Sequence, residues 1–400
     1  MNLFRHSKFV LLAVGLLFPG LCNDRASAQA PAMLQPAPEA TFAPPATGLA
    51  ESFGAAADSG GGAGFVGGVG LYIVQPYFEN NPAFNVLSET HSGTNVATGA
   101  TADRVNVSHR MQAAPLVWLG YVGADGLGAR ARYWYFRQGS DQSIYLAPFT
   151  GDFTVDPVTG NVTQLSGTLY TVTSATPQGL QAFGNTLSRD LGRQSTTFNV
   201  QTKLEAQVGD LEVSQEFRLG QWDVTASGGL RIVRLVQTYN VYEQDSGGPL
   251  EFRNLLSSYD FEGAGPVVAV DLRRRVADSG FNFVANARGA LVMGSAQQDA
   301  LFGGLRLRND DPNPQIAVQE WRRGLPIAEL EVGFEYARAV GGGQFFAQLT
   351  FVGQQWFGAG NASRSSGLTP TQSLNPVLGG APVDSDLAFL GLAVRVGWDY

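Results

Sequence analysis

The chain has 400 residues, with 34 acidic and 26 basic side chains and a formal net charge of −8. This acidic balance argues against a nucleic-acid partner, which would require concentrated positive charge. Fifty glycines, 11% aromatic residues and only 15% charged residues favour an extended, turn-rich all-β chain over helical or α/β architecture.

The first 28 residues are typical of a secretory signal peptide. A basic segment at 5–8 precedes an apolar run at 9–21, and Ala26-Ser27-Ala28 supplies a small-x-small cleavage site. Cleavage after Ala28 removes Cys22, the single cysteine, so we expect neither a disulfide nor a thiolate metal site. Beyond this segment no apolar run approaches the ~20 residues of a spanning helix. Residues 29–63 are rich in Pro, Ala and Gly and predict a disordered periplasmic leader.

From residue 64 to 400 the dominant pattern has a period of two, which places alternate side chains on opposite faces of a strand. The last segment is the clearest example, because its apolar face runs from Ala388 to Tyr400 while Arg395 and Asp399 lie on the opposite face. The pattern predicts ten strands: 65–75, 115–123, 127–138, 197–218, 223–237, 259–272, 280–293, 326–338, 343–356 and 387–400.

The fourth of these segments is unusually long. Its apolar face runs from Phe198 to Val208, with Lys203 and Glu205 opposite, and then changes parity at Gly209-Asp210. A β-bulge at this point would account for the change. A turn there is the alternative and would add a strand. A count of twelve strands is the alternative for the whole barrel.

The connections between these segments alternate between long and short. Long ones cover 76–114, 139–196, 238–258, 294–325 and 357–386, and tight turns separate the other neighbours. This alternation is typical of a transmembrane antiparallel up-and-down β-barrel in the bacterial outer membrane, with both chain ends on the periplasmic side. A soluble β-sandwich or barrel is the structural alternative. The expected partners are outer-membrane lipid and the barrel-assembly machinery, which would recognise the terminal aromatic residues Trp398 and Tyr400.

Several segments resemble a known family when taken in order. They are FVGGVGLYIVQP at 65–76, VWLGY at 117–121, GLGARARYW at 126–134, GGLR at 228–231 and FEGAGP at 261–266. The series resembles the Legionella-type pore-forming outer-membrane proteins, especially their planctomycete branch, over residues 65–400. The resemblance implies a pore-forming barrel and no catalytic residues.

The sequence offers little for a catalytic, cofactor or metal site. His91 and His109 are the only histidines after processing, which is too few ligands for zinc. The DSGG segments at 58–61 and 245–248 are explained by turn chemistry, and the GxGxxG spelled by Gly62, Gly64 and Gly67 opens a strand instead of a helix. An acidic loop at 309–313 resembles a weak Ca²⁺ site, but a solvated loop accounts for it better. We therefore expect no enzyme activity, cofactor or metal.

The charged residues on the polar faces are expected to line the lumen. Seven basic and seven acidic side chains belong to this set: Arg130, Arg132, Lys203, Arg218, Arg231, Arg288 and Arg395, and Glu205, Glu212, Glu216, Glu329, Glu331, Glu335 and Asp399. In a water-filled pore they would act on passing ions or small polar solutes, and passive diffusion is the first functional hypothesis. In a barrel of ten strands the interior is narrow, so a closed structural or surface-interaction barrel is the alternative. An omptin-like surface protease is the third.

Overall fold

The computed structural model describes residues 63–79, 81–93, 97–146, 152–155, 162–174, 182–183, 196–245, 252–276, 279–305, 315–364, 368–369, 377–378 and 385–400. The expected signal peptide (1–28) and all but the last residue of the leader (29–63) lie outside these ranges, as do residues 309–313 of the acidic loop. In the described part of the chain, no helix is long and apolar enough to cross a membrane.

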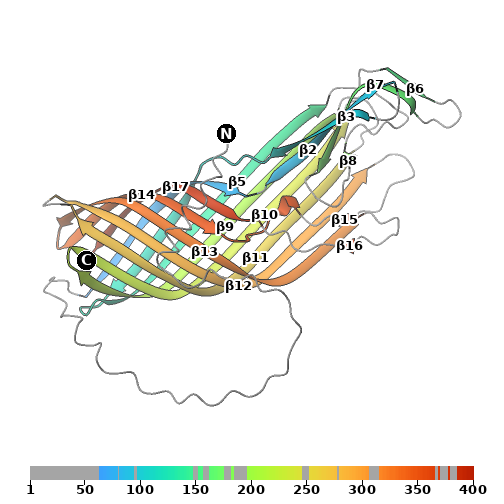
Figure 1. Cartoon of the computed structure of the whole chain (residues 1–400). Coiled ribbons are helices and arrows are strands. Elements are labelled where there is room, and N and C mark those ends of the chain that lie inside the picture. Colours follow the sequence, from blue (N-terminus) through green and yellow to red (C-terminus); the bar gives the residue numbers. More distant parts are fainter. Residues whose placement is uncertain are drawn as a thin grey trace, which may run out of the picture. The chain divides into compact units, whose positions relative to one another are not determined.

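Ten strands close into one antiparallel barrel in the order β1-β17-β14-β13-β12-β11-β10-β9-β5-β4 (Figure 1). Their bounds are β1 (Gly64–Phe78), β4 (Gln112–Val122), β5 (Leu127–Leu146), β9 (Thr196–Leu219), β10 (Trp222–Asp245), β11 (Phe252–Arg275), β12 (Phe281–Leu305), β13 (Gln315–Val340), β14 (Gly343–Trp356) and β17 (Leu387–Asp399). The predicted all-β barrel of ten strands is confirmed. Each predicted strand corresponds to one of these ten.

The bulge or turn predicted at Gly209-Asp210 is wrong. β9 pairs with β10 on one side and β5 on the other, and Gly209 and Asp210 keep the register on both sides. The strand is continuous, and its even-numbered residues face the barrel interior along its whole length. The apparent change of parity in the sequence therefore has another cause, described below.

The two ends of the barrel differ. Short turns join β4 to β5, β9 to β10, β11 to β12 and β13 to β14, and we call this the turn end. At the opposite, loop end the strands run further than the sequence indicated, because β10 to β13 each have 24 to 26 residues. Much of the connections predicted at 238–258 and 294–325 is therefore strand.

A second sheet forms within the connections at the loop end. It comprises β2 (Pro82–Ser92), β3 (Ala97–Asn106), β6 (Asp152–Val155), β7 (Val162–Ser174) and β8 (Ala182–Phe183), with β2 and β7 at its centre. The connection after β14 carries a short 3-10 helix, η2 (Ala362–Arg364), and a small two-stranded sheet of β15 (Leu368–Thr369) and β16 (Val377–Leu378).

Glycine lets neighbouring strands approach closely where they bend around the interior. A Cβ on Gly391 of β17 would lie 2.0 Å from the Ile73 carbonyl oxygen of β1, and one on Gly229 of β10 would lie 1.9 Å from that of Leu211 on β9. Any larger residue would push these strands apart, so glycine here permits the coiling that closes a sheet into a barrel.

The polarity of the barrel wall reverses part of the way along the strands. On the turn-end side of β9 the interior face carries Asp210 and Glu212, while Leu211 and Val213 are each 58% exposed on the outside. Towards the loop end the interior face is apolar and includes the fully buried Leu204. The parity change read from the sequence is this reversal, with no change in backbone register.

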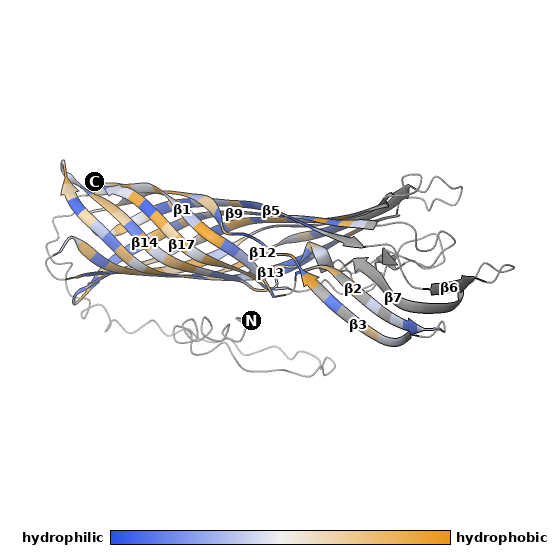
Figure 2. Ribbon diagram, turned by 90° about the horizontal axis from the view of Figure 1, so that it is seen from above, coloured by the Kyte–Doolittle hydropathy of each residue, from blue (hydrophilic) through white to orange (hydrophobic). Residues whose placement is uncertain are grey.

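The same reversal occurs on the neighbouring strands, and the bands of hydropathy along the barrel strands can be followed in Figure 2. On β10 the outward residues change from Leu230 and Ile232 to Arg234, while the inward ones change from Arg231 to Val233 and Leu235. We call the two parts the turn-side zone, with an apolar outer face, and the loop-side zone, with a polar outer face. In the loop-side zone, outward Arg234 of β10 forms surface ion pairs with Asp260 and Glu262 of β11 at 3.4 and 3.0 Å.

Candidate functional site: the charged barrel interior

Charged side chains fill the interior of the turn-side zone. Each lies on the inward parity of its strand, so residues two apart on one strand point into the same space. The group comprises Arg130 and Arg132 of β5, Asp210 and Glu212 of β9, Arg231 of β10, Asp271 and Arg273 of β11, Arg288 of β12, Glu329, Glu331 and Glu335 of β13, and Arg395 of β17.

Glu329 is at the centre of this network. One carboxylate oxygen accepts a hydrogen bond from Arg231 at 2.7 Å, and the other lies 3.3 Å from Arg132. Arg231 is fully buried and also pairs with both oxygens of Asp210, at 2.7 and 2.9 Å. A fully buried guanidinium is tolerated because two carboxylates compensate its charge with good geometry.

Glu212 forms a second node. It lies 2.6 Å from Arg130 of the adjacent β5 and 3.0 Å from Arg288 of β12. Arg130 reaches further, to Asp271 of β11 at 2.9 Å. The four strands β5, β9, β11 and β12 are thereby connected through the space inside the barrel.

Glu331 forms a third node with Arg395 and Tyr72. Arg395 pairs with Glu331 at 2.5 Å, and the Tyr72 hydroxyl donates to the same carboxylate at 2.7 Å. That hydroxyl in turn accepts from Arg132. Nearer the turn end, Glu335 pairs with Arg273 and accepts from Asn282 and Gln348 at 2.8 and 2.7 Å.

These pairs cross the lumen. β5 and β13 are five strands apart in the ten-stranded order, so they lie on opposite walls, yet Arg132 contacts Glu329. The pairs Arg231–Glu329 and Arg288–Glu212 each join strands three apart. Side chains from opposite walls therefore meet inside the barrel at this level.

An aromatic layer lies beyond the charged network. Trp134 of β5, Trp356 of β14 and Phe389 of β17 are buried and pack edge to face, with ring centroids 5.8 to 6.2 Å apart. Phe136 contacts Phe389 at 5.1 Å. Tyr72 joins the two layers, because its ring packs on Trp134 while its hydroxyl belongs to the charged network.

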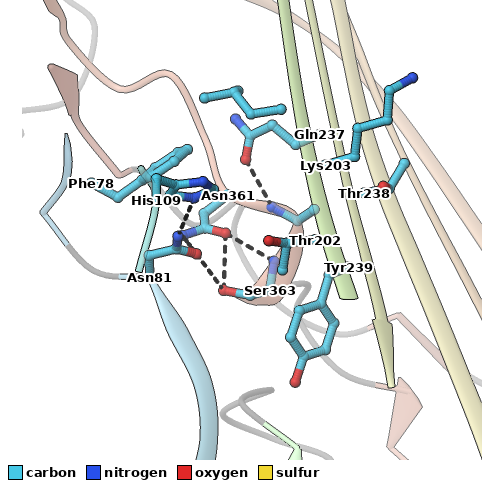
Figure 3. Close-up of a pocket in the computed structure, with 12 residues that line it drawn as sticks. Phe78, Asn81, His109, Thr202, Lys203, Gln237, Thr238, Tyr239, Asn361 and Ser363 are labelled. Carbon is cyan, nitrogen blue, oxygen red and sulfur yellow. Dashed lines mark hydrogen bonds between the residues drawn. The ribbon is translucent and has the colours of Figure 1, made fainter. Parts of the chain in front are cut away.

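A polar cluster closes the interior towards the loop end (Figure 3). Gln237 of β10 donates to the Gly360 carbonyl and accepts from the Ala362 amide, at 3.2 Å each, and so binds the η2 segment inside the barrel. Asn361 and Ser363 both contact Asn81, whose amide lies 3.0 Å from His109 Nε2. The cavity among these residues is about the size of one water molecule.

The predicted lumen residues divide into three groups. Arg130, Arg132, Glu212, Arg231, Arg288, Glu329, Glu331, Glu335 and Arg395 meet in the network. Glu216, Arg218 and Asp399 are exposed at the turn-end mouth, where Arg218 pairs with Asp223. Lys203 and Glu205 alternate with buried Leu204 and Ala206, so they lie on the outer wall and pair there with each other at 2.9 Å. Their assignment to the lumen does not hold, because the polarity of the wall has already reversed at their level.

Four network residues were missed from the sequence. Asp210 was attributed to a bulge, and Asp271 and Arg273 lie at the end of a strand beside further arginines. Asp271 and Arg273 share the parity of the inward residues Val267 and Ala269, and this pattern could have assigned them to the interior. Tyr72 gave no such signal, because its ring is part of an apolar run. In the part of the chain that is described, no group of His, Cys, Asp and Glu is arranged to hold a metal ion.

The architecture is that of a closed antiparallel barrel with a filled, charged interior. A family model described as the Legionella pneumophila major outer membrane protein precursor matches residues 124–400. The chain belongs to this family of outer-membrane proteins, which confirms the resemblance read from its sequence. The segments at 65–76 and 117–121 precede the matched range, and the planctomycete branch stays a prediction.

Solved structures offer only distant likenesses. The outer membrane protease OmpT from Escherichia coli shares 7% identity with a TM-score of 0.36, over 84% of this chain and 96% of that one. The toluene transporter TodX from P. putida shares 6% with a TM-score of 0.16, over 84% and 89%. Similarity at this level carries no argument about function. A search of curated proteins found no match.

Proposed function

We propose that the protein is an outer-membrane barrel with a closed lumen, which anchors and presents a surface structure and does not serve as an open diffusion pore. The observation that carries this proposal is the contact of Arg132 with Glu329 from opposite walls. The aromatic layer above it and the cluster around Gln237 add two further closures. The alternative left open by the sequence is therefore favoured over its first hypothesis.

The outer wall supports the membrane placement. A transmembrane strand needs about 9–11 residues, and the apolar outer face of β9 and β10 is confined to a stretch of about this length beside the turn end. The loop-side zone has an apolar interior and a charged exterior, as expected for protein surrounded by water. In this placement the turns face the periplasm and the loop-side zone projects from the cell. Export by the predicted signal peptide and assembly through Trp398 and Tyr400 belong to the same proposal.

Passive diffusion is the second candidate. It is favoured by the turn-end mouth, where Glu216, Arg218 and Asp399 are exposed and form a polar entrance. A pathway from this entrance would have to break the ion pairs of Glu329 and Glu331 and displace the aromatic layer. A pore would therefore require a second conformation of the interior.

Planar-bilayer conductance of the purified protein separates these candidates. We expect no unitary current steps from the wild type, because three successive layers close the lumen. Clear steps in the wild type, altered in size or ion selectivity by joint Glu329→Gln, Glu331→Gln and Glu335→Gln changes, would establish the pore and reject the closed barrel. The matched control is Glu205→Gln, on the outer wall, which should leave any current unchanged.

We do not propose a surface protease. Catalysis of the omptin type needs His and Asp at the rim, and His91 and His109 are the only histidines after the predicted cleavage. Both are buried, and the side-chain partner of His109 Nε2 is the Asn81 amide, which cannot act as a carboxylate. We accordingly propose a non-enzymatic protein.

A further inference from the structure

Arginine and aromatic side chains form a row on the outer wall at the turn end. Trp222 of β10 is the register partner of Arg274 on β11, Arg274 is that of Phe283 on β12, and Phe283 is that of Phe334 on β13. All four residues lie on the outward parity of their strands. Four neighbouring strands thus contribute one residue each to a continuous lateral row.

The side chains of this row contact one another. The Arg274 guanidinium lies 5.4 Å from the centroid of the Trp222 ring, and the ring of Trp222 is 6.1 Å from that of Phe283. Phe283 is 6.0 Å from Phe334. Beside them, Tyr336 packs against Phe281 with centroids 5.3 Å apart. Arg338 follows Tyr336 as the next outward residue of β13. We call Trp222, Arg274, Phe283, Phe334, Tyr336 and Arg338 the arginine–aromatic patch.

The two arginines of the patch are exposed and lack an ionic partner among the described residues. Arg274 donates to the neutral side chain of Gln221 at 3.1 Å, and Arg338 is exposed near the β13–β14 turn. Two other arginines at this end differ: Arg273 pairs with Glu335 inside the barrel, and Arg218 pairs with Asp223 at the mouth. On the described outward faces of the ten strands near the turn end, these two guanidinium groups are the only charges.

We infer that the arginine–aromatic patch binds the headgroups of anionic phospholipids in the periplasmic leaflet. This inference rests on the proposed function, which puts the turn end at that leaflet. Aromatic rings of this kind settle at the boundary between acyl chains and headgroups. Guanidinium groups at the same depth meet the phosphates and bind them with fork-like hydrogen bonds. Phe345 of β14 is the register partner of Arg338 and borders the patch. Trp398 of β17 pairs with Phe345 and lies two strands from Arg338, so binding should be strongest on β10–β13.

Fluorescence quenching by brominated lipids tests the inference. The full-length mature protein is reconstituted in vesicles of phosphatidylcholine in which either a fraction of that lipid or an equal fraction of phosphatidylglycerol carries brominated acyl chains. The emission lost in Trp222→Phe gives the signal of Trp222, and the emission lost in Trp398→Phe reports on β17, two strands beyond Arg338. A basic residue near the surface raises the local concentration of anionic lipid about fivefold. Trp222, which contacts Arg274, should therefore be quenched more strongly by brominated phosphatidylglycerol, and the same preference should be smaller for Trp398.

The joint variant Arg274→Gln and Arg338→Gln should abolish this preference, whereas Arg218→Gln, an arginine of the mouth, should retain it. Equal quenching of Trp222 by both lipids in the wild type would overturn the inference, as would a preference that survives in the joint variant. Quenching by brominated phosphatidylcholine reports insertion itself. If this quenching is present without a lipid preference, the inference fails while the membrane placement stands, and if it is absent both fail.

Discussion

The buried charges of the barrel interior depend on one another. Arg231 and Glu329 are almost fully removed from solvent, and each is acceptable there only because the other, with Asp210 and Arg132, compensates its charge. Buried ion pairs of this kind contribute little net stability, but the loss of one partner leaves an uncompensated charge. A single substitution in the network should therefore lower the free energy of unfolding much more than the small change in side-chain size would indicate.

Glu329→Gln should lower the free energy of unfolding by about 3 kcal/mol, because it leaves Arg231, Arg132 and Arg288 without their shared carboxylate. Urea unfolding in detergent micelles measures this loss. Glu262→Gln is the matched control, since its ion pair with Arg234 lies on the surface and should be worth less than about 1 kcal/mol. Equal losses for the two variants would show that the interior charges are solvated and do not form a closed network.

His109 should make the loop-end closure sensitive to acid. It lies between β3 and β4, and burial lowers the pKa of His109 to about 4, below its ordinary value of 6.5. Between these two pH values the unfolded segment binds a proton that the folded one does not, so stability should be present above pH 6.5 and be lost as the pH falls towards 4. Amide hydrogen exchange at residues 78, 79, 81 and 358–364 should therefore accelerate over this interval of pH. His109→Gln should remove the pH dependence of the exchange rates. Exchange rates that stay constant with pH in the wild type would contradict the role given to His109.

At the scale of a strand, the reversal of polarity shows how one β-strand can serve two environments. β9 keeps one register over 24 residues, while its outer face changes from Leu211 and Val213 to Lys203 and Glu205. A strand has only two faces, so its inner face must change in the opposite sense. Acidic and basic side chains therefore form ion pairs inside the turn-side zone, and apolar side chains pack together inside the loop-side zone.

In the proposed membrane placement, an arginine on the outer face of the turn-side zone should be far more damaging than one on the outer face of the loop-side zone. Leu392→Arg on the outer face of β17 should lower stability by about 2–4 kcal/mol near the middle of the bilayer. Gln201→Arg, on the outer face of β9 in the loop-side zone, should have nearly no effect. Unfolding of both variants in lipid vesicles measures the difference, and similar losses would mean that the two zones do not face different solvents.

At the scale of the whole molecule, an even number of strands brings both ends of the barrel sheet to the turn end. The Tyr400 amide donates to the Phe65 carbonyl, so the first and last strands meet there. All connections with a second sheet or the 3-10 helix lie at the other end. The orientation of the barrel in the membrane therefore decides which end meets the outside of the cell.

Cysteine labelling on intact cells tests this orientation. Ala124→Cys, in the turn between β4 and β5, should resist a membrane-impermeant maleimide, and Ser143→Cys, exposed near the loop end of β5, should react. The wild type is the background control, because its only cysteine, Cys22, lies in the predicted signal peptide. Labelling of the first variant and protection of the second would reverse the proposed topology.

The sequence by itself determined the ten strands, their alternating connections, the family, and nine charged residues of the interior. These follow from local rules, since a period of two and turn residues are properties of neighbouring positions. Only the tertiary structure decided that the charges pair across the lumen, because a contact such as Arg132 with Glu329 depends on which strands face each other across the barrel. It also decided that Lys203 and Glu205 lie outside and Asp210 inside. A single strand shows two faces but does not show which is inside, and closure of the sheet fixes that choice for all ten strands together.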